Sequence, residues 1–249
     1  MKKGQVTIFI IIGIVILIGI ILIVVFNNNE SSKISFDTSI KSLIDLCVEE
    51  VSEESVYFIG LQGGYYNNQV FSESYSSFKV PYYWYEESAK VPEISVVEEE
   101  FSNYINDNVK LCVDLKLDSF GKSGYDVKTG DIETGVKISD TKLEVNINYP
   151  ITISKGEEVV IYEVFKTEIN TFFKSAYDSA VMMIEKQKEF PDSLPLGSFG
   201  EIAEENGFEI DLVKIEEGTF LINLVFNKNS KEGFIYAFIN QYDWEVENN

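Results

Sequence analysis

The fold of this chain is decided by the stretch KLEVNINYPITI, residues 142–153. Apolar side chains occupy every second position, at Leu143, Val145, Ile147 and Tyr149, and polar side chains fill the positions between them. Successive side chains of a β-strand point to opposite faces of a sheet, so this period of two predicts a strand with one buried and one solvated face. Such a strand is typical of an antiparallel sheet that is covered by helices on one side.

Shorter alternating segments flank this strand, at residues 125–127, 132–138 and 159–169. Turn-forming residues separate the segments, including Thr129-Gly130-Asp131 and Ser154-Lys155-Gly156-Glu157. We therefore predict a four-stranded antiparallel meander.

Helical spacing of apolar residues predicts three longer helices around the meander. They cover residues 35–59, the segment from Val91-Pro92-Glu93 through Cys112, and residues 172–187. Gly60 is a candidate end for the first of these helices. Gly63-Gly64 predicts a turn after it, in preference to a phosphate cradle, because the glycines follow a helix instead of opening one.

Residues 5–29 form an uncharged stretch that is densest in Ile, Leu and Val from Ile8 to Phe26. At about 1.5 Å of rise per residue, a helix over this stretch spans roughly 38 Å, more than the ~30 Å hydrocarbon core of a bilayer. Lys2 and Lys3 precede it and the next cation is Lys33, so the positive-inside bias predicts a cytoplasmic N-terminus and an extracellular C-terminal domain. We predict a single-pass protein of the cell membrane, with the lipid bilayer as a partner.

The leader Lys2-Lys3-Gly4-Gln5 resembles the processing site of archaeal class III signal peptides, the type IV pilin-like family. The resemblance implies cleavage between Gly4 and Gln5 and retention of the apolar stretch in a mature surface protein. That family usually has Glu at the fifth mature position, where this chain has Phe9, and the departure bears on filament assembly. An uncleaved signal-anchor is the alternative. The segment Gly60–Tyr65 also resembles uncharacterised archaeal single-pass membrane-anchored proteins.

The end of the chain has a pattern of its own. Beyond Pro191, a short helix is predicted at residues 198–206, with Ser198 and Glu201 forming a capping box. Three strands follow, at residues 208–215, 219–226 and 234–239. The tail is either a small second domain or an extension of the first, and we assign it to a subdomain.

The predicted organisation is a cytoplasmic leader (1–4), a transmembrane helix (5–29), an exterior α+β domain (30–190) and a small αβββ subdomain (191–249). The fold class is α+β. In it the transmembrane helix continues into an amphipathic helix, and the exterior helices pack on the antiparallel meander.

The composition excludes several classes of function. The chain has 41 acidic residues against 20 basic ones, a net charge of −21, and contains neither Arg nor His. Nucleic-acid binding requires a cationic surface, so we expect no nucleic-acid partner. Lack of His removes the usual general base and zinc ligand, and lack of Arg removes the bidentate clamp for carboxylates and phosphates. We expect no cofactor, no metal and no enzymatic activity.

Cys47 and Cys112 are a candidate disulfide, because both lie on apolar helix faces that could pack together outside the cytoplasm. A pair of buried free thiols is the alternative. The acid clusters at residues 49–54 and 98–100 are expected to be solvated helix faces in preference to cation sites.

The aromatic run Tyr82, Tyr83, Trp84 and Tyr85 lies in a predicted strand. Alternation would bury two of these side chains and expose two. We expect core packing with an ordinary surface, and an interaction patch is the alternative. We expect a cell-surface structural or interaction protein, homo-oligomeric or bound to another envelope protein. An anchored extracellular binding module for a glycan, a small molecule or an envelope partner is the alternative function.

Overall fold

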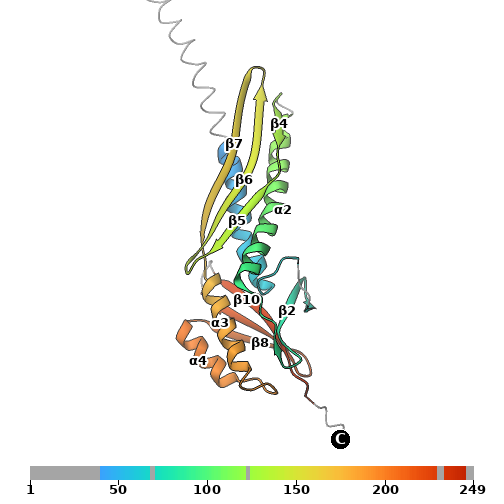
Figure 1. Cartoon of the computed structure of the whole chain (residues 1–249), viewed down its shortest axis with the longest axis vertical. Helices are drawn as coiled ribbons and strands as arrows, with labels where there is room; N and C mark the ends of the chain where they lie inside the picture. The colour runs from blue at the N-terminus through green and yellow to red at the C-terminus, as the bar shows by residue number, and fades with distance from the viewer. Residues whose placement is uncertain (1–39, 68–70, 122–123, 229–232, 245–249) are drawn as a thin grey trace, which may run out of the picture. The chain divides into compact units, whose positions relative to one another are not determined.

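The computed structural model describes residues 40–67, 71–121, 124–228 and 233–244 (Figure 1). The contacts divide the chain into two compact units, residues 1–45 and 46–249. Residues 40–45 of the first unit and 46–61 of the second are helical. The predicted transmembrane helix (5–29) and the processing site Gly4-Gln5 lie outside the described residues. Within the described ranges, no helix is both long and apolar enough to cross a membrane.

The second unit is α+β, as the sequence predicts. After the helix at residues 46–61, its elements are β1 (Ser72–Tyr75), β2 (Phe78–Tyr85), β3 (Ser88–Ala89), α2 (Ile94–Gly121), β4 (Asp126–Thr129), β5 (Glu133–Ile138), β6 (Lys142–Lys155) and β7 (Glu158–Asn170). These are followed by α3 (Phe173–Gln187), α4 (Leu196–Asn206), β8 (Glu209–Glu216), β9 (Thr219–Phe226) and β10 (Phe234–Gln241).

Strand β6 is the centre of a four-stranded antiparallel sheet. Its alternation is confirmed, because Leu143, Val145, Ile147 and Tyr149 are buried at 1% exposure or less. The predicted order of strand pairing in the meander is wrong in one respect. Strands β4 and β5 do not pair with each other but lie end to end along the same edge of β6, and β7 pairs with the other edge.

The segment between β4 and β5 explains this departure from the meander. Both strands are antiparallel to β6, so the chain keeps one direction through Thr129-Gly130-Asp131 and does not reverse. The Gly130 N–H donates to the Pro150 carbonyl at 2.7 Å, where the β6–β7 register shifts. The turn residues therefore bridge an irregularity in β6 instead of forming a hairpin.

The second sheet joins distant parts of the chain in the order β1-β2-β10-β9-β8, with β3 also paired to β2. All three C-terminal strands form as predicted. Because β10 pairs in parallel with β2, they continue the sheet begun at residue 72. Residues 191–249 are therefore better described as an extension of the preceding fold than as the separate subdomain predicted from the sequence.

The helices cover the sheets. Helix α2 begins just after Pro92, as predicted, and packs against β5, whereas α3 packs against β2 and β10 (Figure 1). Helix α4 packs on β8 and begins at Leu196. The predicted capping box is wrong, because Pro195 occupies the N-cap and Ser198 is already inside the helix.

Candidate functional site

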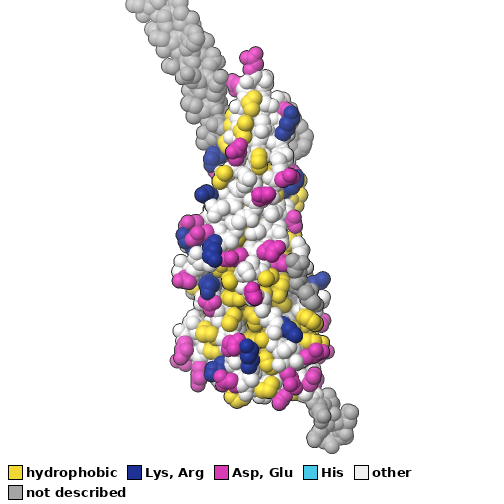
Figure 2. Space-filling view, in the orientation of Figure 1, with side chains coloured by type: hydrophobic (Ala, Val, Ile, Leu, Met, Phe, Trp, Pro, Cys, Tyr) yellow, Lys and Arg dark blue, Asp and Glu magenta, His cyan; other side chains and the backbone are white. Residues whose placement is uncertain are grey.

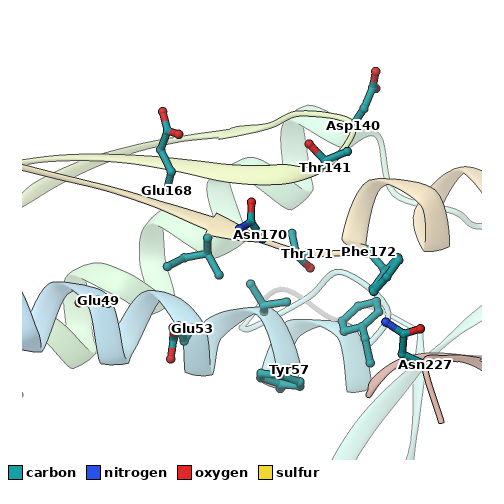
Figure 3. A pocket seen from close by; sticks show the side chains of 13 residues that line it. Glu49, Glu53, Tyr57, Asp140, Thr141, Glu168, Asn170, Thr171, Phe172 and Asn227 are labelled. Carbon is teal, nitrogen blue, oxygen red and sulfur yellow. The ribbon is translucent and has the colours of Figure 1, made fainter. Parts of the chain in front are cut away.

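A groove of the second unit has a volume of about 750 Å³ (Figure 3). Its walls come from the helix at residues 46–61, the β5–β6 turn, the end of β7 and the residues flanking β9 and β10. The lining residues are Glu49, Glu53, Val56, Tyr57, Asp140, Thr141, Glu168, Ile169, Asn170, Thr171, Phe172, Asn227 and Phe234. Among the described residues, this lining includes four carboxylates and no lysine. The groove therefore favours a cationic or hydrogen-bond-donating group and repels an anion.

The carboxylates of the groove do not converge. Figure 3 shows Glu168 and Asp140 pointing away from the helix that carries Glu53. The Glu168 carboxylate instead pairs with Lys142 at 3.0 Å, and hydrogen bonds to Glu168 and then Glu144 raise the pKa of that lysine. Among the described residues, no group of three or more His, Cys, Asp or Glu side chains is placed to hold a metal ion. The groove thus has an acidic character without a preformed ion site.

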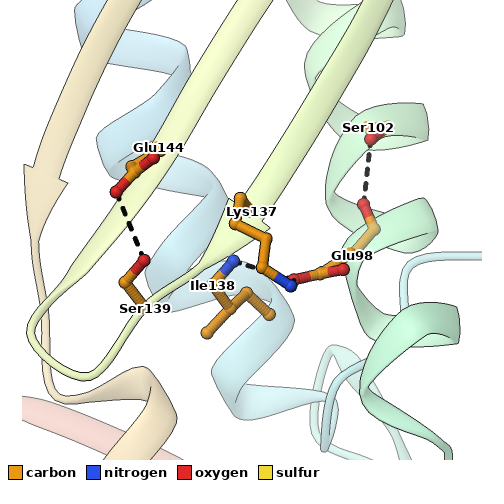
Figure 4. Close-up of polar contacts among 6 residues, drawn as sticks. All are labelled: Glu98, Ser102, Lys137, Ile138, Ser139 and Glu144. Carbon is orange, nitrogen blue, oxygen red and sulfur yellow. Dashed lines mark hydrogen bonds and ion pairs between the residues drawn. The ribbon is translucent and has the colours of Figure 1, made fainter.

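The two acid clusters of the sequence differ in how far their side chains are exposed. Glu49, Glu50, Glu53 and Glu54 are exposed, as expected for a solvated helix face. In the second cluster only Glu99 is exposed. Glu98 accepts hydrogen bonds at Oε1 from the Lys137 ammonium (3.1 Å) and the Ile138 N–H (3.0 Å), and so links α2 to β5 (Figure 4).

Glu100 is the buried member of the second cluster, with 1% of its surface exposed. Its Oε2 accepts the backbone N–H groups of Tyr66 and Asn67, both at 2.7 Å. Burial, and then the charge of Glu100, raise the pKa of Tyr65. The expectation of a solvated face at residues 98–100 is therefore wrong. Glu100 fixes the chain that leaves the glycine turn.

The glycine turn itself excludes the phosphate-cradle interpretation. The Gly64 N–H donates to the Ile59 carbonyl at 2.9 Å, and the Gly63 N–H donates to Gly60, so these donors are already used. Gly63 has φ = +53°, and a Cβ there would lie 2.8 Å from the Ala237 carbonyl oxygen. The helix ends at residue 61, and its glycines permit a close approach to β10. The predicted turn at Gly63-Gly64 is confirmed, whereas the helix runs through the predicted end at Gly60 to Leu61.

We expect Glu100→Ala to lower the free energy of unfolding by about 1.5–3 kcal/mol, because it removes the charged acceptor that the part-buried N–H groups of Tyr66 and Asn67 share. The neighbouring Glu99→Ala removes the same side chain from an exposed position and should change stability by less than about 0.5 kcal/mol. Urea unfolding of the full chain in detergent, followed by circular dichroism, measures both. Equal stability of the two variants would contradict the role of Glu100.

The predicted aromatic patch is largely inside the core. Tyr82, Tyr83 and Trp84 are exposed by 8%, 0% and 2%, and only Tyr85 is half-buried. Core packing is confirmed and the expectation of two exposed side chains is wrong, because successive side chains of β2 are buried on both of its faces. The Tyr83 hydroxyl lies 2.9 Å from the Gly63 carbonyl and 2.6 Å from the Tyr236 hydroxyl.

This burial has an electrostatic consequence. Burial raises the pKa of Tyr83 well above its usual value, with the neighbouring Tyr236 as the next cause. Burial, followed by the charge of Glu73, raises the pKa of Tyr82 to about 12. These tyrosines behave as core residues, so they no longer motivate a glycan-binding surface.

The predicted disulfide is confirmed. Cys47, in the helix at residues 46–61, is bonded to Cys112 of α2, with their Cα atoms 5.8 Å apart. Lys116 and Glu50 add an ion pair at 3.0 Å between the same two helices. The bond covalently links these two helices of the second unit.

Comparison with known proteins gives no relative for this chain: no protein-family model, no curated protein and no solved structure matches it. The groove, the buried tyrosines and the glycine turn must therefore be interpreted from their own chemistry.

Proposed function

We propose that this chain is a single-pass, membrane-anchored structural or interaction protein of the cell surface, with a pilin-like leader and no catalytic activity. The observation that carries the proposal is the uncharged apolar stretch at residues 5–29, preceded by Lys2 and Lys3. It is long enough to cross a bilayer, and the charge bias directs the second unit outward.

The disulfide supports an extracytoplasmic location. Disulfides persist in oxidising compartments, whereas cytosolic thiols are kept reduced. The Cys47–Cys112 bond lies in the unit that the proposal places outside. The acidic composition also suits a surface protein, because a high net charge keeps crowded proteins apart and soluble.

Three measurements on cells that express the full chain test this proposal. Carbonate washing should leave the protein in the membrane fraction, because only an inserted segment resists it. Protease added to intact cells should digest the second unit, while a cytoplasmic marker protein stays intact. Release by carbonate, or protection of the second unit in intact cells, would contradict the proposal.

The pilin-like leader has a separate test. N-terminal sequencing of the purified protein should find a chain that begins at Gln5. A Gly4→Val variant, which alters the residue before the cut, should retain the leader but still reach the membrane. A wild-type chain that keeps Lys2 and Lys3 would remove the pilin-like assignment and leave an uncleaved signal-anchor.

A further inference from the structure

Strand β7 carries an exposed apolar stripe. Val159, Ile161 and Val164 are exposed by 58%, 58% and 60%. In the register with β6 they lie opposite Ser154, Thr152 and Asn148, whose neighbours Ile153, Ile151 and Ile147 face the core. The three side chains therefore share the face of the four-stranded sheet that points away from the core.

The charges on this open face are balanced. By strand register it carries four lysines (Lys128, Lys137, Lys142 and Lys166) and four acids (Asp126, Glu133, Glu144 and Glu168). Acids outnumber lysines about two to one in the whole chain. Figure 2 shows uncharged surface over the middle of the sheet, with apolar side chains beside it. The open face is thus neutral on a strongly acidic protein.

We propose that the open face of β4–β7 is a contact surface for a second copy of this chain. Two copies repel each other over most of their acidic surfaces, and a neutral face with an apolar stripe allows close approach. A two-fold axis along the strands sets the stripe of one copy against the same stripe of the other. The two sheets then meet face to face along their β7 strands.

Edge-to-edge pairing of β7 fits the structure less well. The β6–β7 register shifts between Asn148 and Ile151, which interrupts a regular edge. Glu158 and Glu163 are exposed on the same strand and disfavour the approach of another acidic edge. The face of the sheet, not its rim, is therefore the surface that a second copy covers.

The size of the face indicates a weak dimer. With the two-fold axis over β7, the sheets overlap along one strand about 40 Å long and ~4.8 Å wide, roughly 200 Å² per copy, because the rest of each sheet extends to opposite sides of the axis. Standard stable interfaces bury about 800 Å² per partner. Confinement to one membrane raises the effective concentration of the two copies and compensates for the small area. This step rests on the proposed membrane anchor.

The test uses full-length chains labelled separately with donor and acceptor dyes and reconstituted in liposomes. Energy transfer between wild-type chains should exceed that of an unrelated single-pass protein at the same density. Ile161→Lys or Val164→Lys should weaken self-association at least tenfold, because a charge then enters the apolar stripe. Leu115→Lys is the matched control: it adds the same charge at a side chain of α2 that is 70% exposed, and it should associate like the wild type.

A charge-complementation experiment tests the two-fold arrangement. Donor-labelled Ile161→Lys chains mixed with acceptor-labelled Ile161→Glu chains should recover energy transfer, which neither variant shows with itself. Three results would each overturn the proposal: no energy transfer between wild-type chains, unchanged energy transfer between Ile161→Lys chains, or no recovery of energy transfer in the mixture.

The proposal of a membrane anchor and the proposal of a contact surface can be refuted independently. If carbonate releases the chain from native membranes but Ile161→Lys still abolishes association in concentrated detergent solution, the anchor is refuted and the contact surface stands. If the chain resists carbonate but wild-type copies show no transfer, the contact surface is refuted and the anchor stands.

Discussion

Gly218→Ala should strongly destabilise the second unit, lowering the free energy of unfolding by roughly 3–5 kcal/mol. Gly218 has φ = +72°, and a Cβ at this position would collide with the backbone carbonyl of Tyr242. The Gly218 carbonyl also accepts the Tyr242 N–H at 2.8 Å, so the two backbones cannot separate without breaking that bond. Thermal unfolding in detergent should show a melting temperature about 10 °C or more below the wild type.

Gly156→Ala provides the control for this effect. Gly156 also has a positive φ, +63°, but nothing lies within 4 Å of the position that a Cβ would occupy. Its substitution should cost only the backbone strain, about 1 kcal/mol. If both alanine variants lost the same stability, the collision with Tyr242 would not be the cause.

Removing the disulfide should have the second large effect. The bond closes a loop with a sequence separation of 65, for which the chain-entropy account gives about 4 kcal/mol. The double variant Cys47→Ala/Cys112→Ala should therefore melt roughly 10 °C lower than the oxidised wild type. Lys116→Ala, which removes the ion pair to Glu50 between the same helices, should cost less than about 1 kcal/mol.

The oxidation state has its own measurement. Chains purified without reductant should react with no thiol reagent, and denatured, reduced chains should react at both cysteines. Labelling of Cys47 and Cys112 before reduction would show that the native protein carries free thiols.

The sequence predicts this fold best where an element has one buried face. Strand β6 alternates because helices cover only one side of its sheet, so the period of two survives in the sequence. Strand β2 is covered on both faces, and its partner β10 lies about 150 residues further along the chain. No local sequence pattern predicts the pairing of β2 with β10. The burial of Tyr82, Tyr83 and Trp84 therefore could not be predicted from the aromatic segment alone.

The role of Glu100 was partly accessible from the sequence. Helical spacing places it between Val97 and Tyr104 on the buried stripe of α2, which is an unusual position for an unpaired acid. Its partners, the N–H groups at residues 66 and 67, are backbone atoms of a distant loop and leave no mark in the residue types. Helical spacing thus identifies Glu100 as an unusual buried acid. Only the tertiary structure shows which groups it binds.

The parallel pairing of β2 with β10 also sets an order of events during biogenesis. Strand β2 cannot pair with β10 until residues 234–241 have been synthesised and have left the ribosome, about 150 residues after β2 itself. For a chain threaded through a translocation channel, a premature stop codon before residue 234 would leave Tyr83 and its aromatic neighbours without their cover and create a substrate for quality-control proteases.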